Sequence, residues 1–368
     1  MHIGIDAREL LGQRTGVGRY LANLCAEWMK LPPDTPHRFT LYAPTDGSDP
    51  SVLGPPFDTG PTGPFGYKSL PGQGGSFWEQ FQLADAINSD PPDVLFAPAY
   101  SLPLRVAVPV VLTIHDISFS THPEWFPWRE GIRRRWLTFQ SAKRAAKIIA
   151  VSDFTRRELI IEFGLPPDRV SVVWSGVHQP AQHLVLDREP LVLYVGSIFT
   201  RRHIPELIRA FAHVSRQIAT AQLVLVGDNR SSPRQDPVKL AIAAGIGDRI
   251  TVRSYISESE LSELYAKATV FVFLSEYEGF GFPPLEAMAT GIPTIVGDTE
   301  VARELYMSAS LRVPVNDVMA IAASIRQLLQ DSGKRAALLS AAAARLPHFT
   351  WTRAAADTLR LLERAGSC

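Results

Sequence analysis

Two carboxylates eight positions apart mark the segment of this sequence whose residue types most strongly indicate chemistry. From Glu278 to Glu286 the chain reads Glu-Gly-Phe-Gly-Phe-Pro-Pro-Leu-Glu, directly after the apolar run 270–274. That run predicts a buried strand, so the segment leaves the strand's carboxyl end, where open α/β sheets bind ligands. Carboxylates accept hydrogen bonds from polyols: Glu286, in the first turn of the following helix, suits a ribose, and Glu278 suits a second polyol held over the loop.

The loop between these carboxylates is suited to an anion. Gly279 and Gly281 let backbone amides approach a ligand closely and tolerate positive φ. Pro283 and Pro284 fit the first turn of the following helix, and free amides at a helix amino terminus attract a phosphate. The alternative is a helix capped by acidic residues, with glycines that serve only the turn. It explains the helix but neither the strand nor the paired glycines.

Two arginines follow another predicted strand. The apolar run 192–195 leads into Gly-Ser-Ile-Phe-Thr-Arg-Arg-His, residues 196–203. Arg201 and Arg202 therefore stand near a strand's carboxyl end, where guanidinium groups can clamp a diphosphate. Exposed arginines are usually only solvated, so this prediction depends on their sharing a sheet edge with Glu278. With helix amides they could supply the charge that magnesium otherwise supplies, and since no acidic cluster suits that ion, we expect neither a metal nor a cofactor.

Two further motifs lie in the first half of the chain. His115, with Asp116 to orient it, follows the predicted strand 108–114 and can donate or accept a hydrogen bond at the ligand edge, although a lone histidine is more often a packed core residue. Gly16, Val17 and Gly18 precede a predicted helix, where glycines let the backbone approach an anion. A purely structural turn is an equal alternative. The third glycine of a dinucleotide fingerprint is absent, which argues against a nicotinamide dehydrogenase.

Composition indicates an ordinary globular protein. The 368 residues include 37 basic and 37 acidic ones, so no basic excess suggests nucleic acid as a partner. Two cysteines are too few for a disulfide framework. Neither a signal-peptide pattern nor an apolar run of about 18–20 residues is found, so we expect a cytoplasmic protein.

Short apolar runs alternate with helical segments along the whole chain, which predicts an α/β fold of two tandem doubly wound domains. We expect an N-terminal domain over 1–180, a C-terminal domain over 181–349, and a last helix in 350–368 that crosses back to the first domain. The stretch 44–76, rich in proline and glycine, is interpreted as an irregular flap.

The segment 123–157 combines basic and aromatic residues. It holds nine basic and three acidic residues together with Trp125, Phe126, Trp128, Trp136 and Phe139. Such a segment could lie on an anionic membrane and meet a lipid-linked substrate, so peripheral contact with the inner face of the plasma membrane is one expectation. A solvated helix with aromatic residues in the core is the other.

Together these motifs resemble the retaining glycosyltransferases of family four, which have the GT-B fold of two Rossmann-like domains facing a cleft. The resemblance covers nearly the whole chain. Its motifs are Gly16-Val17-Gly18, Trp78-Glu79-Gln80, His115-Asp116, Ala150-Val151-Ser152, the turn 196–203, the segment 278–289 and Gly291-Ile292-Pro293.

The resemblance implies transfer of a hexose from a nucleotide diphosphate sugar to a glycan or lipid-linked glycan. It implies catalytic roles for Glu278, His115, Arg201 and Arg202, and donor-binding roles for Gly16, Val17, Gly18, Ser197, Phe280, Gly281, Phe282 and Glu286. Where the family often has lysine and asparagine, this chain has Arg202 and His203.

The donor expected from the resemblance is GDP-mannose, because the stretch 115–127 is most similar to bacterial mannosyltransferases of polysaccharide assembly. A UDP-sugar is the alternative. The mechanism would retain configuration, with the leaving diphosphate helping to deprotonate the acceptor. A nucleotide-sugar isomerase or epimerase on the same fold and a non-catalytic nucleotide-sugar binding module remain the rival hypotheses.

Overall fold

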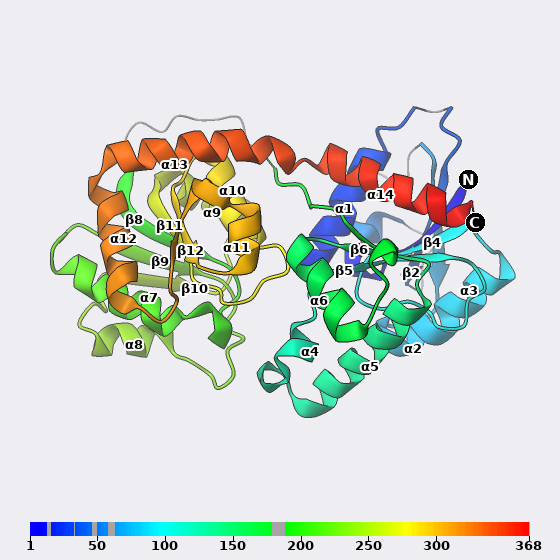
Figure 1. Cartoon of the computed structure of the whole chain (residues 1–368), viewed down its shortest axis with the longest axis horizontal. Coiled ribbons are helices and arrows are strands. Elements are labelled where there is room, and N and C mark those ends of the chain that lie inside the picture. The colour runs from blue at the N-terminus through cyan, green and yellow to red at the C-terminus, as the bar shows by residue number, and fades with distance from the viewer. Residues whose placement is uncertain (13–15, 33, 46–49, 58–62, 179–187, 368) are drawn as a thin grey trace. The chain divides into compact units, whose positions relative to one another are not determined.

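The computed structural model describes residues 1–12, 16–32, 34–45, 50–57, 63–178 and 188–367. The chain forms two compact units (Figure 1). The first comprises Met1–Gly176 and Thr350–Cys368, and the second comprises Val177–Phe349. The expected domain boundary between residues 180 and 181 lies outside the described residues.

Each unit is built on one parallel sheet. The first sheet has the order β3-β2-β1-β4-β5-β6-β7 and the second the order β10-β9-β8-β11-β12-β13. The strands of the first are β1 (His2–Asp6), β2 (Arg38–Pro44), β3 (Phe65–Leu70), β4 (Val94–Ala97), β5 (Val110–Ile114), β6 (Lys147–Ala150) and β7 (Val170–Val172). Those of the second are β8 (Glu189–Val195), β9 (Gln222–Val226), β10 (Ile250–Arg253), β11 (Ala268–Phe273), β12 (Thr294–Gly297) and β13 (Ser310–Val313).

Helices connect these strands. In the first unit they are α1 (Gly16–Trp28), α2 (Gly75–Trp78), α3 (Ala84–Ser89), α4 (Ser118–Thr121), α5 (Trp128–Arg144), α6 (Asp153–Phe163) and α14 (Trp351–Gly366). In the second they are α7 (Ile204–Ser215), α8 (Pro237–Ala243), α9 (Glu258–Lys267), α10 (Phe282–Ala289), α11 (Glu300–Leu305), α12 (Val318–Gln330) and α13 (Ser332–Arg345).

The order of the strands makes both units doubly wound. Chain order reverses beside β1 in the first sheet and beside β8 in the second, so right-handed crossovers place helices on both faces. Burial agrees, since every residue of β5 and β11 is buried. The predicted α/β fold with two doubly wound halves is confirmed.

The last helix packs back on the first. In α14 the carbonyl oxygen of Ala355 accepts a hydrogen bond of 3.1 Å from the indole Nε1 of Trp28 in α1. The hydroxyl of Thr352 donates to Glu27 at 2.9 Å. Figure 1 shows the two helices side by side, and the predicted return of the C-terminal helix is confirmed.

Part of the stretch predicted to be irregular forms a strand. Within 44–76, residues Phe65–Leu70 form β3 and pair in parallel with β2. The prediction failed there because the segment is flanked by prolines and glycines and its edge strand contains Gly66, a residue type depleted in strands. Farther along the chain, a π-helical turn at Glu79–Leu83 separates α2 from α3.

A buried ionic cluster lies at the carboxyl end of β1. The Arg8 guanidinium stands 3.1 Å from Asp6 and also donates to Glu79. The Ser101 hydroxyl lies 2.8 and 2.9 Å from the two carboxylate oxygens of Glu79. Burial raises the pKa of Asp6 to about 6, because one guanidinium shared between two buried carboxylates does not offset the loss of water.

We expect this cluster to make stability depend on pH. Folded Asp6 keeps its proton to a higher pH than the unfolded chain does, so the free energy of unfolding should fall as pH rises from about 4 to about 6. Asp6→Asn cannot ionise and should therefore gain stability relative to wild type across that window. Urea unfolding at several pH values measures the difference. Asp85→Asn, at an exposed position, is the control, and a pH-independent difference for Asp6→Asn would contradict the prediction.

Candidate functional site

The candidate site of the second unit lies where its strand order reverses. Strands β8 and β11 are neighbours, and the next strands along the chain from each lie on opposite sides. Ligands of doubly wound sheets bind at such a point, outside the carboxyl ends of the strands. The segment 196–203 leaves β8 and the segment 274–281 leaves β11. The structure therefore brings the predicted arginines and Glu278 to one sheet edge.

The turn that follows β8 is tightly packed at Gly196, beside the Arg202 side chain. Gly196 has a φ of 143°, and a Cβ added there would lie 2.7 Å from Nη1 of Arg202. The carbonyl oxygen of Ser197 accepts hydrogen bonds from the Tyr194 hydroxyl at 2.9 Å and from Arg202 Nη1 at 2.8 Å. This predicted donor-binding residue thus contributes its main chain to anchoring Arg202.

Arg202 forms an ion pair with Glu278. Its Nε and Nη2 atoms donate to Oε1 of Glu278 at 3.0 and 2.9 Å. The two side chains are only 11% and 18% exposed, and the guanidinium also lies 4.8 Å from the centre of the Phe273 ring. Burial opposes the charge on Arg202, but the Glu278 carboxylate holds the pKa of Arg202 above its ordinary value. From the sequence we expected Arg202 to bind a diphosphate. In the structure its guanidinium donates hydrogen bonds to the Glu278 carboxylate and the Ser197 carbonyl oxygen.

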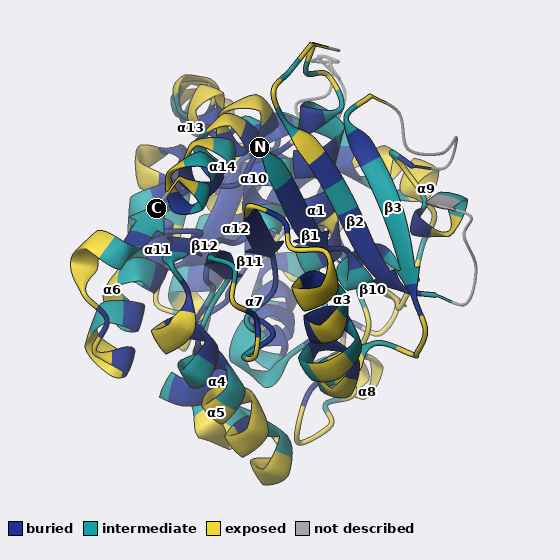
Figure 2. Ribbon diagram, turned by 90° about the vertical axis from the view of Figure 1, so that its right-hand side faces the viewer, coloured by how far each residue is buried: buried dark blue, intermediate teal, exposed yellow. Residues whose placement is uncertain are grey.

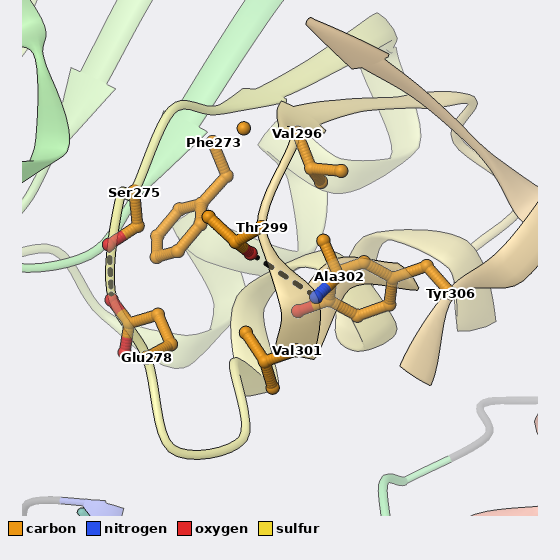
Figure 3. Close-up of a pocket in the computed structure, with 9 residues that line it drawn as sticks. Phe273, Ser275, Glu278, Val296, Thr299, Val301, Ala302 and Tyr306 are labelled. Carbon is orange, nitrogen blue, oxygen red and sulfur yellow. Dashed lines mark hydrogen bonds between the residues drawn. The ribbon is translucent and has the colours of Figure 1, made fainter. Parts of the chain in front are cut away.

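The hydrogen bonds fix the orientation of the Glu278 carboxylate. Oε1 also accepts a hydrogen bond of 2.9 Å from the Ser275 hydroxyl (Figure 3). Within the described ranges, all the donors that bind this carboxylate converge on Oε1. Oε2 is therefore the oxygen that can accept a hydrogen bond from a ligand hydroxyl.

The segment 196–203, which follows β8, contacts the segment 274–281, which follows β11, through Arg201 and His203. The carbonyl oxygen of Arg201 accepts a hydrogen bond of 3.1 Å from the amide of Glu276. The Arg201 guanidinium stacks 4.2 Å from the Phe199 ring centre. His203 has a left-handed backbone, and its Nε2 lies 3.2 Å from the Glu276 carboxylate. This histidine therefore sits between the arginines and the start of α7.

Gly281 forms the turn into α10. Its φ is 83°, and a Cβ built there would lie only 2.2 Å from the Tyr306 hydroxyl oxygen. That hydroxyl donates to the Gly281 carbonyl oxygen at 2.9 Å. Burial, with Glu278 nearby, raises the pKa of Tyr306 well above its ordinary value, so the proton stays in place. Only glycine meets both the backbone and the space requirement at this position.

The start of α10 offers fewer amides than a typical helix. The helix begins at Phe282, and Pro283 and Pro284 follow, so two of the first amides are missing. The helix dipole and the amide of Gly281 lie at this end of the helix, where they favour an anion. The Phe280 and Phe282 rings lie 5.1 Å apart, and Glu286 is partly buried one turn into the helix.

A small pocket lies beside Glu278 at the ends of β11 and β12 (Figure 3). It encloses about 210 Å³, open solvent included, and is lined by Phe273, Ser275, Glu278, Val296, Gly297, Thr299, Val301, Ala302 and Tyr306. Ser275, Thr299 and Tyr306 were not predicted from the sequence. Ser275 could have been found, since it is the polar residue directly after the apolar run. Tyr306 is distant in sequence and gives no such signal.

His115 lies in the first unit, directly after β5. Its Nε2 lies 2.9 Å from the carbonyl oxygen of Pro98, which can only accept, so this nitrogen carries the proton. Burial lowers the pKa of His115, which leaves Nδ1 as an acceptor on a neutral ring. The Tyr20 ring holds the imidazole edge to face at 4.9 Å.

The other predicted residues of the first unit take different positions. Asp116 accepts hydrogen bonds from the Ser118 amide and hydroxyl at 2.9 and 2.6 Å and from the Tyr100 hydroxyl at 3.0 Å. It therefore anchors its own loop. Gly16, Val17 and Gly18 form the first turn of α1, with Gly16 exposed and Gly18 buried.

Two family models together cover most of the chain. Residues 178–345 match the family model described as glycosyl transferases group 1, and residues 14–179 match that of glycosyltransferase family 4. The chain is 31% identical over 280 residues to O-antigen chain mannosyltransferase B of Escherichia coli, covering 72% of this chain and 73% of that protein. It is 25% identical over 219 residues to the O-antigen chain mannosyltransferase RfbU of Salmonella typhimurium, covering 60% of each.

The fold is also found among solved structures. The crystal structure of Anabaena HepE in complex with UDP and glucose aligns with a TM-score of 0.74 at 19% identity, covering 99% of this chain and 100% of that one. At this identity the likeness shows the GT-B fold and nothing more specific.

Proposed function

Because this chain belongs to family 4 of the glycosyltransferases, retaining enzymes that use nucleotide sugars, we propose that it transfers mannose from GDP-mannose to a glycan or lipid-linked glycan. The donor assignment rests on the similarity to an O-antigen chain mannosyltransferase over 72% of the chain. The hexosyltransferase class follows from family membership. The donor, the acceptor and the roles of individual residues are the proposal.

Glu278 is assigned to the transferred sugar. Its Oε1 is held by Arg202 and Ser275, which leaves Oε2 to accept a hydrogen bond from a sugar hydroxyl. Arg202 then acts as a positioning residue, because its guanidinium fixes the carboxylate. A carboxylate fixed in this way does not have to reorganise as charge develops on the sugar ring.

Arg201 and the loop amides are assigned to the diphosphate. The Arg201 guanidinium lies on the same segment as Arg202, and the amides of Phe280 and Gly281 lie at the positive end of α10. They would stabilise the negative charge that grows on the leaving group. The leaving diphosphate oxygen would take the acceptor's proton on the face from which it departs, which retains the configuration. This mechanism asks the protein for positioning rather than for a strong base.

The first unit is assigned two contacts. Neutral His115, with its proton fixed on Nε2, would accept a hydrogen bond from a sugar hydroxyl at Nδ1. The first turn of α1, from Gly16 to Gly18, would lie near the diphosphate, since exposed Gly16 carries no side chain to obstruct it.

Glu286→Ala is expected to weaken nucleotide binding with a smaller effect on kcat. Its carboxylate would accept two hydrogen bonds from the ribose, and charge-assisted hydrogen bonds contribute about 1.5–3 kcal/mol each. We expect GDP to bind at least about tenfold more weakly to the variant. Calorimetric titration with GDP measures this, with Glu300→Ala on α11 as the control. If Glu286→Ala binds GDP as tightly as wild type does, Glu286 does not bind the ribose.

The donor assignment is tested by supplying purified protein with GDP-mannose, UDP-glucose and UDP-N-acetylglucosamine, with and without lipid-linked acceptors. We expect the fastest release of nucleoside diphosphate from GDP-mannose, stimulated by acceptor and maintained in excess chelator. Preference for a UDP-sugar would overturn the donor. Conversion of the donor's sugar to another sugar without acceptor would favour the isomerase or epimerase. Binding of the donor without any turnover would favour the non-catalytic module. Loss of activity in chelator that magnesium restores would contradict the metal-independent mechanism.

A further inference from the structure

One face of α5 exposes large apolar side chains. Trp128, Ile132 and Trp136 recur every fourth residue and are 57–68% exposed, whereas Trp28 and Trp78 are 1% exposed. Figure 2 shows the outer face of this helix as one of the exposed surfaces of the first unit. Spacing of four residues places the three side chains in one row along the helix. A single exposed tryptophan needs no explanation, but a row of this kind usually marks an interaction surface.

A second pair of exposed aromatic side chains lies on a segment beside α5. The Arg133 guanidinium in α5 donates to the Ser76 hydroxyl in α2 at 2.9 Å, which places α2 beside α5. Phe77, next to Ser76, is 67% exposed and packs against the partly exposed Phe81 with ring centres 4.6 Å apart. We call Phe77, Phe81, Trp128, Ile132 and Trp136 the α5 patch.

Positive charge accompanies the patch. Helix α5 contains six basic residues and one acidic residue, a net charge of +5. The acidic residue, Glu130, is paired with Arg134. Helical spacing places Arg129 and Arg133 on one side of the apolar row and Arg135 on the other. The Arg129 guanidinium lies 5.4 Å from the Trp128 ring centre. Tryptophan flanked by arginine matches the interfacial zone of a bilayer, where rings enter the headgroup layer and guanidinium groups meet phosphates.

We propose that the α5 patch binds the surface of an anionic lipid bilayer. Within the described residues no helix is long and apolar enough to cross a membrane, so α5 would lie along the surface. A second copy of this chain fits the patch less well. A two-fold interface would place the same patch on both sides, and two helices of net charge +5 would repel one another. An anionic surface removes that repulsion.

Only part of the segment 123–157, for which the sequence offered membrane contact as one expectation, belongs to the α5 patch. Of the aromatic residues in 123–157, Trp125 stacks on His122 at 4.0 Å and Phe139 packs edge to face on Phe163 at 5.5 Å. Both are partly buried and stand apart from the row. The patch instead includes Phe77 and Phe81, which lie outside that segment. The proposal is independent of the donor sugar, so failure of either leaves the other standing.

The test is co-sedimentation of the full chain with vesicles of phosphatidylcholine containing phosphatidylglycerol, compared with phosphatidylcholine alone. We expect binding only to the anionic vesicles, weakened by salt. Trp128→Ser/Trp136→Ser should lower the partition coefficient at least about tenfold, because buried apolar area contributes directly to it. Arg129→Gln/Arg135→Gln should lower it roughly five- to thirtyfold, since each basic residue near such a surface contributes about 1 kcal/mol.

Ile161→Ser on α6 is the matched control, because Ile161 is 75% exposed in the same unit but outside the patch. It should bind vesicles as wild type does, and all variants should keep the wild-type far-ultraviolet circular dichroism and GDP affinity. Equal binding of wild type and Trp128→Ser/Trp136→Ser would overturn the proposal. So would sedimentation velocity that shows a wild-type dimer lost in that double variant while no protein binds vesicles.

Discussion

Glu278→Gln is expected to lower kcat by about two to three orders of magnitude, the range found when one group that stabilises a transition state is removed. Glutamine keeps the size of the side chain but loses the charge. Its amide oxygen can still accept from Arg202, yet Oε2 is replaced by a donor and can no longer accept from a sugar hydroxyl. We expect KM and GDP affinity to change less than kcat, since the nucleotide is assigned to Glu286.

The same substitution should also reduce stability. Arg202 would remain buried without its counter-ion, and breaking a buried pair by removing one partner is strongly destabilising. Partial exposure of both side chains reduces the cost, so we expect up to about 3 kcal/mol. The matched control is Glu276→Gln, which is exposed and lies two residues away. Steady-state kinetics and urea unfolding of both variants measure the two effects. Comparable kcat values in both would contradict the role given to Glu278.

Arg202→Lys separates positioning from charge. Lysine keeps the positive charge but cannot reach Glu278 and Ser197 in the same geometry as the guanidinium, which uses Nε and both terminal nitrogens. If Arg202 acts by fixing Glu278, kcat should fall while GDP affinity stays near the wild-type value. A large loss of GDP affinity would instead indicate direct contact with the diphosphate.

Gly281→Ala is expected to abolish most activity and to destabilise the second unit. The new Cβ would lie 2.2 Å from the Tyr306 hydroxyl oxygen, so the loop or the tyrosine must move. The φ of 83° adds strain of about 1–3 kcal/mol for a residue with a side chain. Because this loop carries the amides assigned to the diphosphate, we expect kcat/KM to fall about a hundredfold or more.

Two variants separate strain from collision. Gly245→Ala is the control for strain, since Gly245 has a φ of 76° with nothing within 4 Å of an added Cβ. Tyr306→Phe removes the colliding oxygen and leaves the next ring atom 3.5 Å away, so Gly281→Ala/Tyr306→Phe should recover part of the stability lost in Gly281→Ala. Purely additive losses in this double-mutant cycle would show that the collision is not the cause.

The fold could be predicted from the sequence because the core strands are short, continuous apolar runs that alternate with helical segments. The runs 110–114 and 268–273 are buried throughout, as parallel strands covered on both faces should be. The failures lie where local signals are weak or where tertiary contacts decide. Edge strand β3, which the sequence predicted to be irregular, contains a glycine and is recognised only by its pairing with β2.

The candidate site could be predicted in part. Glu278, Arg201 and Arg202 could be placed at one sheet edge because each follows the carboxyl end of a predicted parallel strand. The structure added that the two strands, β8 and β11, are neighbours at the reversal of strand order. The ion pair between Glu278 and Arg202 could not be foreseen, since sequence position does not show which donors a buried guanidinium uses. Tyr306 was missed because its contact with Gly281 spans 25 residues.

Retaining transfer of mannose, as proposed for this chain, is tested most directly by carbon-13 NMR of GDP-mannose labelled at the anomeric carbon, incubated with wild-type protein and a lipid-linked acceptor. We expect consumption of GDP-mannose in preference to UDP-glucose, a product that keeps the donor's α configuration, and no comparable consumption by Glu278→Gln. A β-linked product would contradict retention of configuration. Intact GDP-mannose under conditions in which another nucleotide sugar is consumed would contradict GDP-mannose as the donor.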